Sequence, residues 1–228
     1  MPVSKSASIE FVETAERINE PVTKFGGQPV WIEESQWPLS KQTGNPMEFI
    51  CQIELSENLF TGSKGKMAYI FMTEEEEYID GTWEPDGGEN AIIIQPGIPS
   101  VKVKEIQGGP SIKKYVKVEG YDRLQPQLKE YSVLLTVQED PEYASEEIRS
   151  NWDDSKFDEY AQSLDGNKIG GTPIFLQGDE FPDGGGFKLL LQLDSTQIPF
   201  HVNFGDAGIA YAFINQDGTA GKFLWQCA

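Results

Sequence analysis

The chain has few of the residues on which catalytic and metal sites are usually built. Its 228 residues include one histidine and two cysteines. Two cysteines are too few for a disulfide framework, and no histidine and cysteine group has zinc-site spacing. His201 lies between hydrophobic residues with no nucleophile motif beside it, so a structural role is favoured over a catalytic one. We therefore expect no catalytic residues, no bound metal and no cofactor.

The sequence also lacks long apolar runs. Its mean hydropathy is -0.43, and no stretch is long and apolar enough to predict a membrane-spanning helix. Residues 1–20 contain no apolar segment of the kind found in secretory signals. With so few cysteines, these features favour a cytoplasmic location without membrane contact, and Cys51 is expected to be a small core residue.

Positive charge is scarce as well. The chain has 18 Lys and Arg against 37 Asp and Glu, for a net charge of -19 and a pI near 4.3. Such a surface repels nucleic acid and anionic lipid. It suits a basic protein or peptide as partner, or it serves solubility alone, and it does not indicate an oligomeric state.

What the sequence does contain is an internal repeat. KFGGQPVWI at residues 24–32 returns as KIGGTPIFL at residues 168–176, an offset of 144 positions from Gly26 to Gly170. Three further blocks keep the same order: WP and FP at 37 and 181, FICQIE and LLLQLD at 49 and 189, and AYIF and AYAF at 68 and 210. The paired glycines precede proline rather than a helix, so they predict a tight turn and not a phosphate loop.

Period-two alternation dominates the rest of the chain, with Met47, Phe49, Cys51 and Ile53 predicted on one face of a half-buried strand. We expect a mainly β (β-rich α+β) fold, a β-roll of two duplicated, pseudo-twofold-related units with one or two helices. Residues 1–228 form one domain with repeats at about 24–73 and 168–214 and a variable insert at 74–167. Strands are predicted at 29–33, 47–55, 65–73, 91–95, 101–104, 115–118, 133–137, 173–177, 187–194, 208–214 and 221–227, a helical stretch at 141–164, and a short strand or loose helix within 1–20.

Gln52 and Gln192 occupy matching places in apolar strands, where an amide needs hydrogen-bond partners. Each either bonds to the backbone of a Gly-Gly turn, which we favour, or lines a cleft that reads a ligand. Aromatic residues near the repeats are either core residues or ligand anchors. The candidate partner-binding residues are Trp31, Trp37, Gln52, Phe175, Gln192 and Asp206.

The repeat blocks, together with FGDAG at residues 204–208, resemble the bacterial YwqG-like family, a domain of unknown function, over about residues 20–228. That resemblance implies a β-rich roll built by duplication and no established catalytic residues. The family is similar to a wider group with programmed-cell-death-type proteins that act as chaperones of a ribosomal protein. The zinc-binding cysteines of those relatives have no counterpart here.

These observations favour a non-enzymatic interaction module, chaperone-like for a basic client, that binds along an acidic cleft between the repeats. Two alternatives stay open. One is a toxin-immunity inhibitor whose acidic surface mimics nucleic acid, and the other is a carbohydrate-acting enzyme with paired carboxylates. The acidic loops, such as residues 80–86, do not match a calcium-binding loop because Pro85 replaces the required glycine.

Overall fold

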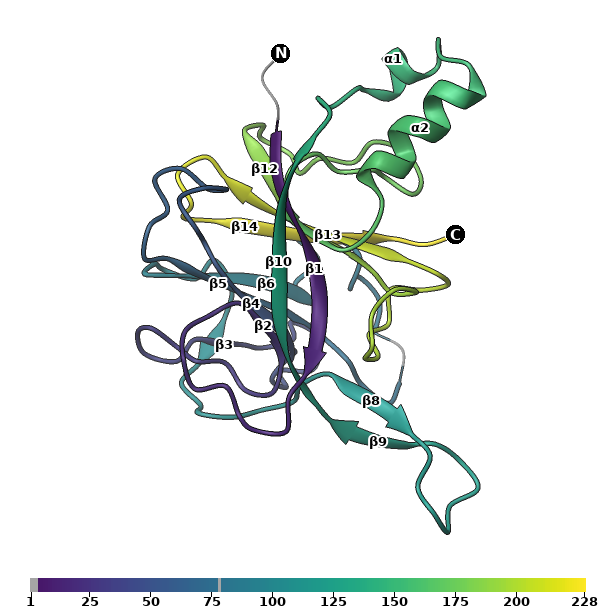
Figure 1. Ribbon diagram of the computed structural model, residues 1–228. Helices are drawn as coiled ribbons and strands as arrows, with labels where there is room; N and C mark the ends of the chain where they lie inside the picture. The colour runs from purple at the N-terminus through teal and green to yellow at the C-terminus, as the bar shows by residue number, and fades with distance from the viewer. Residues whose placement is uncertain (1–3, 78) are drawn as a thin grey trace.

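A ten-stranded antiparallel sheet that nearly closes on itself forms the body of the protein (Figure 1). The structure is a computed structural model that describes residues 4–77 and 79–228. The strand order across the sheet is β14 (Gly221–Gln226), β13 (Ile209–Asn215), β12 (Phe187–Asp194), β11 (Lys168–Gly170), β1 (Ser4–Glu13), β10 (Glu130–Asp140), β2 (Lys24–Gly26), β4 (Glu48–Glu54), β5 (Met67–Met72) and β6 (Asn90–Gln95). The fold is therefore mainly β, as expected.

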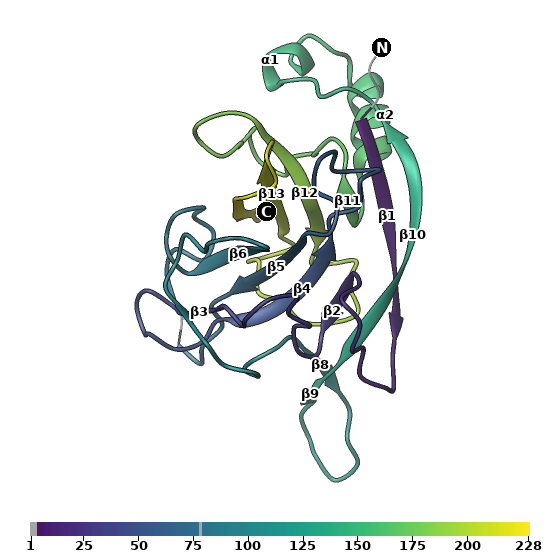
Figure 2. The same cartoon turned by 90° about the vertical axis from the view of Figure 1, so that its left-hand side faces the viewer.

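The two longest strands, β1 and β10, pair along their full length at the centre of this order, from Ser4 opposite Asp140 to Glu13 opposite Tyr131. On one side of them lies the first half-sheet (β2, β4, β5 and β6), and on the other the second half-sheet (β11 to β14). Each long strand borders the half-sheet that does not follow it in the chain, and we call this arrangement the crossover. β1 is followed in the chain by β2 but pairs with β11, and β10 is followed by the segment that leads to β11 but pairs with β2. Figure 2 shows β1 and β10 running side by side along one edge of the molecule.

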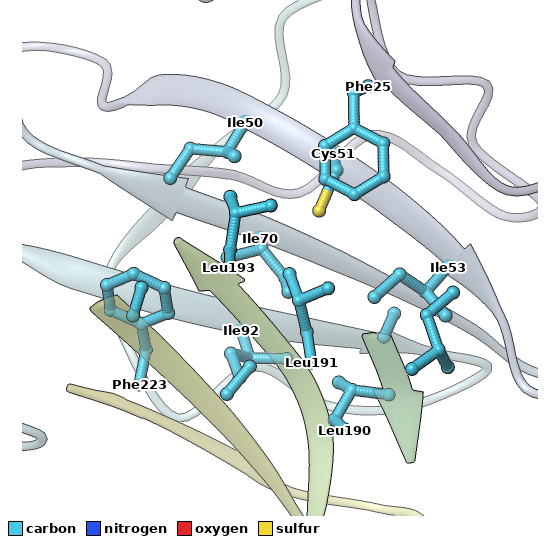
Figure 3. Close-up of a cluster of buried hydrophobic side chains, with 14 of the residues drawn as sticks. Phe25, Ile50, Cys51, Ile53, Ile70, Ile92, Leu190, Leu191, Leu193 and Phe223 are labelled. Carbon is cyan, nitrogen blue, oxygen red and sulfur yellow. The ribbon is translucent and has the colours of Figure 1, made fainter. Parts of the chain in front are cut away.

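The main hydrophobic core fills the space between the two half-sheets. Figure 3 shows side chains of β4, such as Cys51 and Ile53, facing Leu191 and Leu193 of β12. All four have 1% or less of their surface exposed, and burial of this kind is the main force that holds such a sheet together. Cys51 is thus a core residue, as predicted.

The predicted faces of β4 are corrected by an irregularity in the strand. The register shifts between Phe49 and Cys51, so Phe49 packs in an outer cluster with Trp37 and Phe71 while Cys51 packs in the main core. β12 has the same shift between Leu189 and Leu191. A β-bulge turns the side chains that follow it to the other face. Both faces of β4 are buried, so the strand is not half-buried as the alternation predicted.

Small elements cover the rest of the sheet. β3 (Trp37–Pro38) pairs with β7 (Val103–Lys104), and β8 (Lys113–Val116) forms a projecting hairpin with β9 (Gln125–Leu128). The predicted helical stretch is two helices, α1 (Glu146–Arg149) and α2 (Asp154–Leu164). Among the described residues no helix has the length and apolarity needed to cross a bilayer.

Two predicted strands are absent. Residues 29–33 and 173–177 are not strands, because side chains of the sheet, rather than a neighbouring strand, bind their backbone. For residues 1–20 a short strand or a loose helix was expected, and the structure has a strand at residues 4–13 that is longer, at ten residues, than the short one predicted. Residues 1–3 of that prediction lie outside the described residues.

Candidate functional site

Each Gly-Gly pair turns the chain sharply between a buried strand and a loop. All four glycines have positive φ, from +65° at Gly27 to +82° at Gly171, a backbone conformation that other residues adopt only with strain. A Cβ atom on Gly27 would meet the carboxylate of Glu130, and one on Gly171 would meet that of Asp140. The predicted tight turns are therefore confirmed, and each packs directly against a carboxylate.

Those two carboxylates pair with the lysines that open the repeated motifs. Lys24 forms an ion pair with Glu130, and Lys168 lies 2.9 Å from Asp140. Both lysines are buried, and desolvation lowers the pKa of each ammonium group although the paired carboxylate acts in the opposite direction. With their partners inside the protein, these buried charges hold the turns in place and are not exposed to a ligand.

The two glutamines of the repeat connect the sheet to the loops on either side of each turn. Gln52 accepts a hydrogen bond from the Val30 amide and donates one to the Val22 carbonyl, both at 2.8 Å. Gln192 accepts from the Ile174 amide at 3.0 Å and donates to the loop before β11. Both side chains are buried. The favoured prediction that each amide binds the backbone of a Gly-Gly turn was therefore wrong, because the partners are backbone groups on either side of the turn.

Two further side chains in each half-sheet bind the next residues of the loop. The Tyr69 hydroxyl accepts from the Ile32 amide and donates to the Val30 carbonyl, and Tyr211 binds residues 174–176 in the same way. Gln95 binds the Glu33 amide at 3.1 Å and the Glu34 carbonyl at 2.7 Å. Gln226 binds the Gln177 amide and the Gly178 carbonyl in the same way, and these two residues lie 144 positions after Glu33 and Glu34.

Beyond these matched hydrogen bonds, an acidic pocket of about 310 Å³ opens beside the first loop. Its lining includes Trp31, Glu33, Glu34 and Glu105, and Arg17 is the only basic residue among its described lining residues. The three glutamates are exposed, and none forms a side-chain ion pair with a described residue. We call this hollow the Trp31 pocket.

The aromatic wall of the Trp31 pocket is rigidly held. The Trp31 ring lies 4.4 Å from Tyr69 and 6.0 Å from Phe71, measured between ring centroids. Two covered polar atoms nearby, Trp31 Nε1 and Ser35 Oγ, have no hydrogen-bond partner among the described residues. An unpaired buried donor or hydroxyl is costly, so both atoms are unsatisfied polar groups in the wall of the pocket.

The second half-sheet has a different arrangement at the matching place. Asp179 stands where the first repeat has Ser35, and it accepts a hydrogen bond from Arg149 at 2.7 Å and one from the Glu146 amide at 2.6 Å. Burial opposes the ionisation of Asp179, but bonds from Tyr143, Glu146 and Arg149 outweigh it and lower its pKa. Helix α1 thus inserts an arginine where the first half-sheet has an open pocket.

The remaining predicted site residues lie apart from this pocket. Trp37 is fully buried and donates its indole N–H to the Met47 carbonyl, while Phe175 takes the place of Trp31 in the second half-sheet. Asp206 lies in the exposed turn before β13. Burial leaves Trp37, Gln52 and Gln192 with no surface for a partner in this fold. Their binding role and those of Phe175 and Asp206 stay predictions.

Several residues of the pocket were missed by the sequence reasoning. Glu33 and Glu34 follow Trp31 after one intervening residue, Ile32, and that closeness in the sequence was a usable signal. Glu105 of the pocket, like Arg149 at the matching place of the second half-sheet, belongs to the segment between the repeats, whose course the motif does not reveal. Among residues 4–77 and 79–228, no group of three or more histidine, cysteine or acidic side chains is arranged to hold a metal ion.

The comparison with curated proteins finds no match to this chain. A family model described as a domain of unknown function (DUF1963) matches residues 23–223, from just before the first Gly-Gly turn to β14. The matched range includes both repeated motifs and the entire segment between them. The protein therefore belongs to the DUF1963 family.

Proposed function

We propose that this protein is a non-enzymatic binding module whose Trp31 pocket holds an arginine or lysine side chain of a protein or peptide partner. The observation that carries the proposal is Arg149. In the second half-sheet the guanidinium of Arg149 binds Asp179. Asp179 directly follows residues 177–178, whose backbone is bound by Gln226. In the first half-sheet the same scaffold holds an acidic pocket into which the described part of the chain inserts no helix.

The chemistry of the pocket suits a cation. Glu33, Glu34 and Glu105 supply three carboxylates against the single positive charge of Arg17. The face of a tryptophan attracts cations as well, by about 0.5–1 kcal/mol at an exposed site. The net charge of -19 would steer a basic segment toward the protein and speed its association.

Three broader statements belong to the same proposal. The matched hydrogen bonds support an origin of the two half-sheets by duplication of one unit. A chaperone-like role for a basic client would use the Trp31 pocket as its recognition site. A cytoplasmic location is consistent with two free thiols, Cys51 and Cys227.

The test is a titration of the isotope-labelled protein with acetyl-Gly-Ser-Arg-Ser-Gly-amide, followed by NMR. We expect shifts at the backbone amides of residues 30–35 and 105–107 and at the Trp31 indole. A peptide with citrulline in place of arginine has nearly the same shape and no charge. It should bind at least about fivefold more weakly, since a hydrogen bond to a charged group contributes about 1.5–3 kcal/mol.

A matched pair of variants separates the pocket from the overall charge. Glu33→Gln with Glu34→Gln should weaken binding of the arginine peptide by about fivefold or more. Glu119→Gln with Asp122→Asn removes the same charge from the exposed connection of β8 and β9 and should leave binding unchanged. Equal losses in both variants, or equal binding of the citrulline peptide, would refute the proposal.

A further inference from the structure

A second pocket, of about 420 Å³, lies at the seam where the two edge strands of the sheet, β6 and β14, meet. Its apolar wall includes Ile92 of β6 and Phe223 of β14, which also belong to the main core and lie near each other in Figure 3. Its size lies within the roughly 300–1,000 Å³ typical of small-molecule sites. We call it the seam pocket.

The seam pocket reverses the charge of the rest of the molecule. Lys41, Lys102 and Lys222 line it, and Asp86, paired with Lys222, is the one acidic side chain among its described lining residues. Lys102 is exposed and has no side-chain ion pair or hydrogen bond with any described residue. In a chain with 18 basic and 37 acidic residues, three lysines around one hollow create a local site of positive potential.

A buried polar side chain adds a second kind of contact. Asn90 is 4% exposed and lines the seam pocket. Its amide nitrogen donates to the Thr82 and Glu84 carbonyls, at 2.9 Å each. The amide oxygen has no hydrogen-bond partner within the described residues and is not one of the covered polar atoms, so it is an accessible acceptor that a ligand donor can reach.

We infer that the seam pocket binds a small organic anion that carries a hydroxyl or amine donor. Its carboxylate or phosphate group would lie among the lysines, with Lys102 free to bind it. The apolar body would pack on Ile92 and Phe223, and the donor would reach Asn90 Oδ1. This site differs in place and in charge from the Trp31 pocket, so either can fail without the other.

The probe for the test is 4-hydroxybenzoate, which combines a carboxylate, an apolar ring and a hydroxyl group. Titrated into the isotope-labelled protein at low salt, it should shift the amides of residues 88–92, 101–102 and 221–223. Neutral 4-hydroxybenzamide tests the anion, and benzoate tests the donor. Each should bind at least about fivefold more weakly, because the benzamide lacks the negative charge and benzoate lacks the hydroxyl donor. Phenyl phosphate is compared with benzoate, because both lack the ring hydroxyl, and the tighter of these two anions identifies whether the site prefers phosphate or carboxylate.

Lys102→Met should weaken 4-hydroxybenzoate by about tenfold, the effect of losing one charged hydrogen bond. The control, Lys64→Met, removes the same charge from an exposed loop outside the pocket and should leave the affinity unchanged. Shifts confined to other residues, equal binding of 4-hydroxybenzamide, or equal losses in the two lysine variants would overturn the inference.

Discussion

Glu48 is a buried carboxyl group at the start of β4, 6% exposed. Burial raises its pKa from 4.5 to about 7; Lys113, whose Nζ lies 3.5 Å away, opposes this rise, and the charge of Glu74 adds to it. Between about pH 4.5 and 7 the folded protein therefore holds a proton that the unfolded chain has released. By linkage, the free energy of unfolding falls as the pH rises through this window. The stability that protonated Glu48 allows is fully present below about pH 4.5 and is lost above about pH 7.

Glu48→Gln should remove this dependence, because a neutral amide replaces the group that ionises. One pKa unit corresponds to about 1.4 kcal/mol, so the variant should be more stable than the wild type by about 3 kcal/mol at pH 8 and nearly equal to it at pH 4.5. Urea denaturation at both pH values measures the difference. Glu54→Gln, at the exposed end of the same strand, is the control that makes the same chemical change outside the core. The assignment fails if the stability of Glu48→Gln relative to the wild type is the same at both pH values.

At the scale of the element, the short strand β11 depends on how closely its turn approaches β10. Gly171 has φ +82° and packs against Asp140, which also binds Lys168 at 2.9 Å and the Thr172 amide at 3.0 Å. Gly44 has a similar φ of +74°, but open space surrounds the position of its missing Cβ.

Both Gly171→Ala and Gly44→Ala strain the backbone, at a cost of about 1–2 kcal/mol. Gly171→Ala must in addition displace Asp140 and leave Lys168 as an unpaired buried charge, which costs about 3–5 kcal/mol. We therefore expect Gly171→Ala to lose several kcal/mol more than Gly44→Ala in denaturant unfolding. Equal losses in the two variants would show that the carboxylate contact contributes nothing.

Most elements of this fold could be predicted from local patterns. Alternation located β4 and β5, and a short apolar run located β6. Residues 29–33 could not be assigned correctly, because their extended backbone is bound by Gln52, Tyr69 and Gln95, which lie far along the chain. The bulges in β4 and β12 leave no signal in the apolar pattern, since both faces of these strands are buried.

At the scale of the whole molecule, the two half-sheets are not independent. β1 pairs with β10 and β11, which lie more than a hundred residues further along the chain. β10 in turn pairs with β2, which lies about a hundred residues earlier in the chain. A repeated motif predicts two similar units but contains no information on which long strand borders which unit. This crossover and the acidic pocket beside Trp31 therefore became visible only in three dimensions.

The crossover predicts how the protein behaves when it is cut. A protease site inserted after Gly120, beside the exposed Tyr121 and Leu124 of the hairpin between β8 and β9, would separate β1 from both of its partner strands, β10 and β11. The nicked protein should stay one species in size-exclusion chromatography and keep its circular dichroism. Residues 1–120 and 121–228 produced separately should each be unfolded. The uncut protein with the same insertion is the control, and cooperative unfolding of either fragment alone would contradict the prediction.

The pairing of Ser4 with Asp140 also has a consequence during synthesis. A ribosome that adds about 5–20 residues per second releases β1 several seconds or more before either of its partner strands exists. Throughout that interval the nascent chain presents a long strand with unpaired backbone groups, which is a template for association with other chains. The yield of folded protein should consequently depend on how quickly translation passes from residue 14 to residue 170, and on what protects the early strand until then.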